Sequence, residues 1–128
     1  MLTVIAICLG ACVGALSRWQ LGLWLNPSTA SAGLLPWGTL AANLIGGYAV
    51  GVALGVFAQQ AALAPEWRLF VITGVLGGLT TFSTFSGEVV TSLQAGHPGW
   101  ALAIAASHLV GSLLLTAAGL ATVGAWRG

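Results

Sequence analysis

The 128-residue sequence has very little charge. It contains three arginines, no lysine, no aspartate and two glutamates, so that 4% of its residues are charged while 58% are hydrophobic. Soluble domains carry about 25% charged residues, and a chain with so few cannot keep its surface hydrated. The absence of any basic run argues against nucleic acid as a partner. The composition therefore predicts a membrane protein.

The scarcity of titratable groups also argues against an enzyme. Glu66 and Glu88 are the only side-chain carboxylates in the sequence, so no Ser-His-Asp set, HExxH motif or carboxylate pair can be assembled convincingly. Cysteine is scarce as well. Cys8 and Cys12 lie four residues apart in an apolar run, and no histidine or further cysteine nearby completes a metal site. We interpret both as small apolar side chains.

Four apolar segments are long enough to cross a bilayer, which takes about 20 helical residues. They cover residues 2–25, 37–59, 66–93 and 98–126, with short loops between them. The six tryptophans are Trp19, Trp24, Trp37, Trp67, Trp100 and Trp126. All lie near segment ends, where indole rings favour the membrane interface. The sequence predicts an all-α membrane protein in which residues 1–128 form a single domain of four transmembrane helices.

The arginines hardly indicate an orientation. Arg68 and Arg127 fall on one side of the predicted membrane, against Arg18 on the other, whereas positive residues normally gather on the cytoplasmic side. A chain with so weak a bias could insert both ways, and two opposed copies could pair. Glycines spaced four apart, such as Gly47 and Gly51, allow close helix packing, either between copies or within one subunit.

The third span contains an unusual polar stretch, GGLTTFSTFS, at residues 77–86. Each glycine weakens a helix by about 1 kcal/mol relative to alanine, and hydroxyl side chains offer the backbone competing hydrogen bonds. The stretch predicts a broken helix, which at membrane depth is tolerated only where it is buried in protein or lines a wet cavity. The alternative is a kinked, inert helix whose hydroxyls bond to their own chain.

Polar and aromatic groups at membrane depth are the candidate site residues, because burying polar groups there is costly. The amide of Asn43, one turn after Thr39, could donate to an anion or bond to another helix. Phe82 and Phe85 could pack in a core, or they could turn their positive ring edges toward a dehydrated anion. Glu88 could bind a cation, relay a proton or anchor at the interface.

The fourth span carries a polar stripe in which His108, Ser112 and Thr116 follow at intervals of four residues, with Ile104 interrupting it one turn earlier. His108 could donate to an ion or pair with a backbone carbonyl. The hydroxyls of Ser112 and Thr116 could equally bond back to their own helix. Arg18, in GALSRW, could snorkel to the interface or draw anions toward a pore mouth.

The motifs GALSRW, GTLAANLIGGY and GGLTTFSTFSGE resemble those of the fluoride channel family called Fluc or CrcB. Length, four spans and motif order also fit, so the resemblance covers essentially the whole chain. It implies a passive, fluoride-selective channel of the cell inner membrane that exports cytoplasmic fluoride and lowers its toxicity. It also implies an antiparallel, dual-topology homodimer with two pores and a central structural Na⁺.

The resemblance assigns roles to individual residues. The backbone carbonyls of Gly77 and Thr80 would hold the Na⁺. The fluoride pore would be lined by Asn43, Phe82, Phe85, Ser112 and Thr116, with Thr39, Ser83, Ser86 and Glu88 as nearby polar contributors. From the residues themselves we add His108 to the predicted pore and Arg18 as a vestibule charge. Ile104 and His108 depart from the tyrosine and serine that the family pattern has there, which puts the upper fourth-span track in doubt.

The main alternative is a small, dual-topology, proton-coupled multidrug exporter. That class needs a carboxylate embedded early in the chain, typically in the first span, whereas Glu66 and Glu88 come later. A structural subunit is a third hypothesis, which the heavily disrupted third span argues against. A passive channel is distinguished from a fluoride–proton antiporter by the resemblance alone.

Overall fold

The structure, a computed structural model, describes residues 1–26, 35–60 and 62–126. Within these residues the fold is entirely helical, with four helices long and apolar enough to span a membrane. Three of them are continuous: α1 (Leu2–Leu25), α2 (Trp37–Gln59) and α6 (Pro98–Ala125). The third span consists of α3 (Pro65–Arg68), the π-helix η1 (Leu69–Leu76), α4 (Gly77–Leu79) and α5 (Phe82–Gln94).

The helix ends follow from local sequence signals and lie within one residue of the predicted limits. The backbone of Asn26 is extended after α1, and its side chain accepts a hydrogen bond from the Gly38 amide at 2.8 Å, which ties the end of α1 to the start of α2. Gly96 has a φ of 78°, a left-handed conformation that suits glycine after a helix. Pro98 then occupies the first turn of α6.

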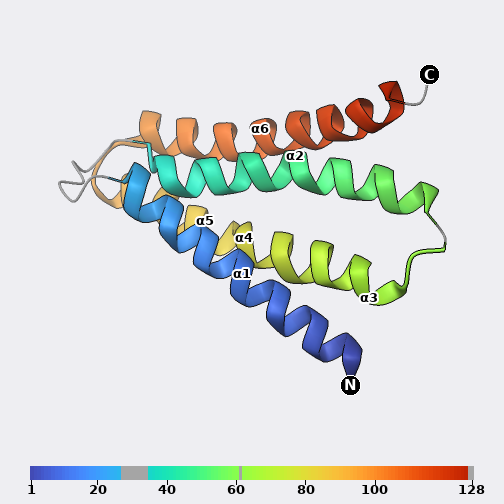
Figure 1. Cartoon of the computed structure of the whole chain (residues 1–128). Helices are drawn as coiled ribbons and strands as arrows, with labels where there is room; N and C mark the ends of the chain where they lie inside the picture. Colours follow the sequence, from blue (N-terminus) through green and yellow to red (C-terminus); the bar gives the residue numbers. More distant parts are fainter. Residues whose placement is uncertain (27–34, 61, 127–128) are drawn as a thin grey trace.

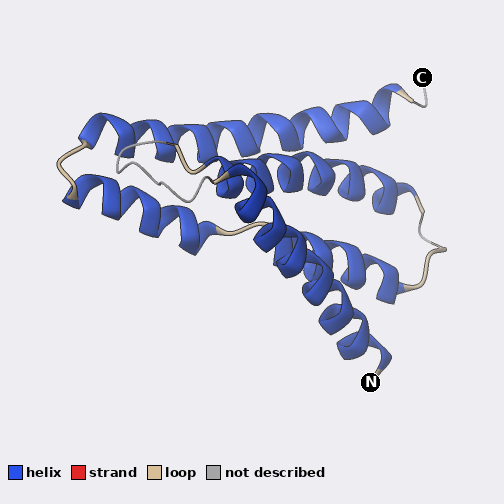
Figure 2. Ribbon diagram, turned by 60° about the vertical axis from the view of Figure 1, so that its left-hand side comes forward, coloured by secondary structure: helices blue, strands red, loops and turns tan. Residues whose placement is uncertain are grey.

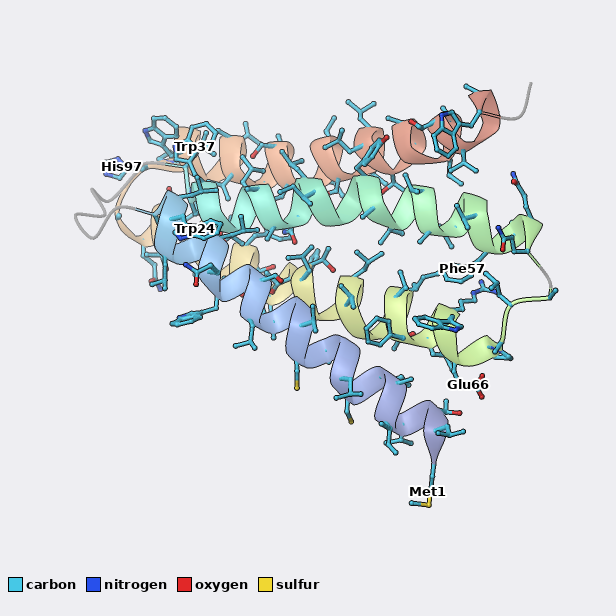
Figure 3. The ribbon with its side chains drawn as sticks, in the orientation of Figure 1. Met1, Trp24, Trp37, Phe57, Glu66 and His97 are labelled. Atoms are coloured by element: carbon cyan, nitrogen blue, oxygen red, sulfur yellow. The ribbon has the colours of Figure 1, made fainter. Side chains whose placement is uncertain are left out.

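Figure 1 shows α2 lying along α6, with α1 crossing the third span. The start of α1, the connection from α2 to α3 and the end of α6 lie at one end of the bundle. Figure 3 places Trp24, Trp37 and His97 at the opposite end. This alternation is what four successive membrane crossings require. Arg127, one of the charges used above to judge orientation, lies outside the described residues.

The surface of the bundle is strongly apolar. Leu113 and Leu114, for example, are 64% and 65% exposed, while the buried apolar cluster is small and contains Ala42, Ala53, Leu76 and Leu79. An exposed apolar surface of this extent marks a membrane or protein interface. The distribution therefore agrees with a multi-pass protein whose outer face meets lipid.

Glycines allow the helices of this one subunit to approach closely. A Cβ added at Gly14 would collide with the backbone of Val75 and Leu79, and one added at Gly51 would collide with the carbonyl of Thr116. Gly10, Gly47, Gly55, Gly74, Gly78 and Gly119 are similarly close to a neighbouring helix. Of the two alternatives for the glycine rows, packing within one subunit is the one observed.

Candidate functional site

The predicted interruption of the third span lies at Thr80 and Thr81. Their backbones are extended, with φ and ψ of −80° and 154° at Thr80 and of −152° and 123° at Thr81, and Figure 2 shows the resulting loop between the two half-helices. The Thr80 hydroxyl donates to the carbonyl of Leu76 at 2.8 Å. The Thr81 hydroxyl accepts from the Thr84 amide at 3.1 Å and so caps α5. The broken helix is therefore confirmed against the merely kinked one, although the hydroxyls of Thr80 and Ser86 do bond to their own chain, as that alternative expected.

Asn43 of α2 bridges this break. Its Oδ1 accepts from the Thr81 amide at 2.7 Å, and its Nδ2 donates to the Thr81 carbonyl at 2.9 Å. The same Nδ2 lies 2.8 Å from Nδ1 of His108 on α6. Asn43 is 6% exposed, so these bonds satisfy groups that would otherwise be buried without partners. Its amide is thus bonded to two other helical segments, which is the helix–helix alternative stated above.

The break also frees backbone carbonyls. In a continuous helix the carbonyls of Gly77 and Thr80 would accept from the amides four residues later. The amide of Thr81 instead donates to Asn43, and that of Thr84 donates to the Thr81 hydroxyl. Carbonyls released at an unwound membrane helix can coordinate Na⁺. The arrangement around Gly77 and Thr80 therefore fits the sodium ligands that the resemblance implies.

A cleft of about 300 Å³ lies beside the break. It is lined by Asn43, Thr80, Thr81, Phe82, Phe85, His108, Leu109, Ser112, Leu113 and Thr116. The rings of Phe82 and Phe85 meet edge to face, with centroids 4.8 Å apart. Phe85 also stacks on His108 at 4.8 Å with an interplanar angle of 16°. The cleft thus brings together seven of the residues singled out from the sequence, drawn from α2, the break, α5 and α6.

The three residues of the polar stripe on α6 differ in how fully their polar atoms are hydrogen-bonded. The Thr116 hydroxyl donates to the carbonyls of Gly47 and Ser112, at 3.0 and 2.9 Å. The Ser112 hydroxyl makes no hydrogen bond to any residue that the structure describes. His108 is 2% exposed, and its Nε2 has no partner within the described part of the chain. An unpaired buried donor or acceptor costs about 1–3 kcal/mol, so this atom is a candidate contact for a ligand.

Four of the ten pore candidates, Thr39, Ser83, Ser86 and Glu88, lie outside the cleft lining. Thr39 donates to Oε1 of Glu88 at 2.6 Å, while the other carboxylate oxygen is buried without a partner among the described residues. Ser86 bonds back to the Phe82 carbonyl at 2.9 Å, and Ser83 lies 3.4 Å from the Thr81 hydroxyl. The structure thus joins Thr39 and Glu88 into a separate polar pair between α2 and α5.

Arg18 lies against the break. Its Nε donates to the carbonyl of Gly78 at 3.2 Å, and its NH1 lies 3.5 Å from the hydroxyl of Thr84. The side chain therefore links α4 to α5 across the interruption, a role that neither sequence alternative included. Thr81 and Thr84 were missed as individual site residues. The preference for threonine at helix N-caps is the signal that could have identified Thr81.

The chain is similar in sequence to known proteins over nearly its whole length. The model of the family described as CrcB-like protein, Camphor Resistance (CrcB), matches residues 5–120. A protein of Paracidovorax citrulli named fluoride-specific ion channel FluC is 57% identical over 126 residues, which cover 98% of this chain and 97% of that protein. The protein of the same name from Pseudomonas paraeruginosa is 59% identical over 118 residues, covering 92% and 91%.

Proposed function

The chain belongs to the CrcB-like protein family, and from this premise we propose that it is a passive, fluoride-selective channel. It lets cytoplasmic fluoride leave the cell across the inner membrane and so confers resistance to fluoride. The names of its relatives support fluoride as the ion. The structural observation that carries the proposal is the cleft, which places hydroxyl, imidazole and aromatic groups beside a broken helix inside a membrane span.

The lining of the cleft suits a small anion that has lost its water. Dehydrating fluoride is costly unless hydrogen-bond donors replace the lost water molecules. The Ser112 hydroxyl is free of protein partners in the described chain. Phe82 and Phe85 also line the cleft, and an anion in contact with their positive ring edges would be further stabilised. Among the lining residues none carries a carboxylate that would repel an anion.

The proton-coupled exporter has less support. That class needs a carboxylate early in the chain, typically in the first span, and α1 contains none. Glu88 is the membrane-embedded carboxylate in the described chain, but it bonds to Thr39 and does not line the cleft. We therefore retain the exporter only as the outcome of a failed fluoride test.

Fluoride efflux from liposomes tests the proposed function. We expect purified protein to release fluoride from loaded vesicles when K⁺ permeability balances the charge, and to release no chloride under the same conditions. Protein-free vesicles are the control. Equal release of both halides would contradict the proposal. Release of fluoride coupled to proton uptake would identify an antiporter instead.

We further propose that the working unit is an antiparallel, dual-topology homodimer with a structural Na⁺. Phe82 is 75% exposed, and Ser83 and Thr84 are also exposed on one subunit. An interrupted backbone is tolerated in a membrane only when protein or water covers it. A second copy packed against this face would provide that cover. The carbonyls of Gly77 and Thr80 would hold the ion at that position.

Two measurements test the dimer and the sodium site. In detergent with Na⁺ we expect a particle of twice the 12.9 kDa subunit mass, and a lower thermal unfolding midpoint once a bulky organic cation replaces Na⁺. A monomer in both buffers would contradict the dimer. A dimer whose midpoint is the same in both buffers would contradict the sodium site.

A further inference from the structure

The hydrogen bonds around Asn43 determine which nitrogen of His108 carries its proton. The Thr81 amide can only donate, so the side-chain atom of Asn43 that faces it at 2.7 Å must be the amide oxygen. The amide nitrogen is then the atom that lies 2.9 Å from the Thr81 carbonyl and 2.8 Å from His108 Nδ1. An amide NH₂ has no acceptor capacity, so Nδ1 must accept. A neutral His108 therefore carries its proton on Nε2.

This Nε2–H is a donor that has no partner among the described residues. His108 is 2% exposed, its Nε2 has no hydrogen bond within the described chain, and the side chain lines the cleft. The stacked ring of Phe85, 4.8 Å away, limits rotation of the imidazole. The proton assignment makes Nε2 a hydrogen-bond donor, and a group that only donates is suited to an anion or water and not to a cation.

We propose that the Nε2–H of His108 binds the permeating fluoride ion, and that Asn43 is a positioning residue that acts through His108. The amide hydrogens of Asn43 already bond to Thr81 and His108. Asn43 therefore fixes the imidazole tautomer and does not itself contact the anion. Ser112, one turn further along α6, supplies the next donor. This inference rests on the proposed function, because it takes fluoride as the ion that enters the cleft.

Nitrogen NMR of ¹⁵N-histidine-labelled protein in bilayers tests the tautomer and the contact together. We expect the His108 proton on Nε2, and a shift of that resonance on addition of sodium fluoride but not of sodium chloride. His97, the second histidine, is the residue before α6 and lies outside the cleft lining, and a His97→Gln variant removes its signals. A proton on Nδ1, or a resonance that fluoride leaves unchanged, would overturn the proposal. An equal response to chloride would also overturn it.

A pair of variants tests the donor in transport. His108→Ser and His108→Ala leave similar space and both deprive Asn43 of its partner, but only serine retains a donor. We expect the alanine variant to release fluoride at least about tenfold more slowly than the serine variant, as the loss of one hydrogen bond to a charged group predicts. Both variants should still exclude chloride, and His97→Gln should match the wild-type rate.

Equal rates for the two His108 variants, at equal thermal midpoints, would contradict the role of the donor. If neither variant folds, the NMR measurement on the wild-type chain still decides. The two hypotheses fail differently. Wild-type protein that moves no fluoride refutes the channel whatever the NMR result. Rapid fluoride flux together with an Nε2 resonance that fluoride leaves unchanged refutes only the His108 contact.

Discussion

Replacement of Asn43 by leucine is expected to reduce fluoride efflux to the background of empty vesicles and to lower the thermal unfolding midpoint markedly. Leucine has a similar size but makes no hydrogen bond, so the amide and carbonyl of Thr81 and the Nδ1 of His108 would each lose a partner. Each such buried group costs about 1–3 kcal/mol. The measurements are vesicle efflux and thermal unfolding in detergent.

Ser17→Ala is the matched control for this change. The Ser17 hydroxyl donates to the Val13 carbonyl within its own helix, at 2.8 Å, and it is exposed. Its removal deletes a polar side chain from a membrane helix without affecting the break, so efflux and midpoint should stay near the wild-type values. An Asn43→Leu protein that transports at the wild-type rate would show that the break holds its shape without the amide.

The sequence predicted the helices well because their limits depend on local properties. Span length follows from the thickness of the hydrocarbon core, and tryptophans mark where each span meets the interface. The interruption was predictable for the same reason, since adjacent glycines and clustered hydroxyls weaken a helix wherever they occur. The packing partners of the glycine rows were not a local property, and the close approaches within the subunit, as at Gly14 and Gly51, were visible only in the fold.

The π-helical segment η1 could not be predicted from composition. Its residues, LFVITGVL, are as apolar as an ordinary membrane helix, and the change from α to π hydrogen bonding depends on how the segment packs against its neighbours. Here η1 lies against α1, where Gly10 and Gly74 bring the two backbones together. Such π segments occur frequently at functional sites, and only the short helix α4 separates this one from the break.

The contact partners of the site residues could not be predicted either, because they also depend on how distant segments pack. Arg18 meets Gly78 across 60 positions of the chain, and Asn43 meets His108 across 65. No spacing rule within one helix indicates such contacts, so Arg18 was left between snorkelling and a vestibule role. The sequence identified which side chains were unusual at membrane depth. The fold determined which of them share the cleft and which, like Thr39 and Glu88, pair elsewhere.

Replacement of Phe85 by isoleucine is expected to slow fluoride efflux by about tenfold or more, equivalent to a barrier increase of ~1.4 kcal/mol. Isoleucine is apolar and fills much of the space, but it has no positive ring edge for an anion. The ring of Phe85 both meets Phe82 edge to face and stacks on His108. Its loss therefore removes one anion contact and loosens two others. Phe82→Ile, which removes one ring of the edge-to-face pair, should also slow efflux.

Phe57→Ile separates this effect from the loss of an aromatic ring in general. Phe57 lies on α2, far from the break, and packs against the buried apolar cluster. Its replacement should reduce stability modestly, as a large-to-smaller change near a core does, while the efflux rate per folded protein stays unchanged. Phe85→Ile should instead slow efflux per folded protein, by far more than any loss of stability accounts for. If both variants lost transport only in proportion to folded protein, the phenylalanines beside the break would be packing residues, and the donors on α6 and at the break would have to account for anion dehydration alone.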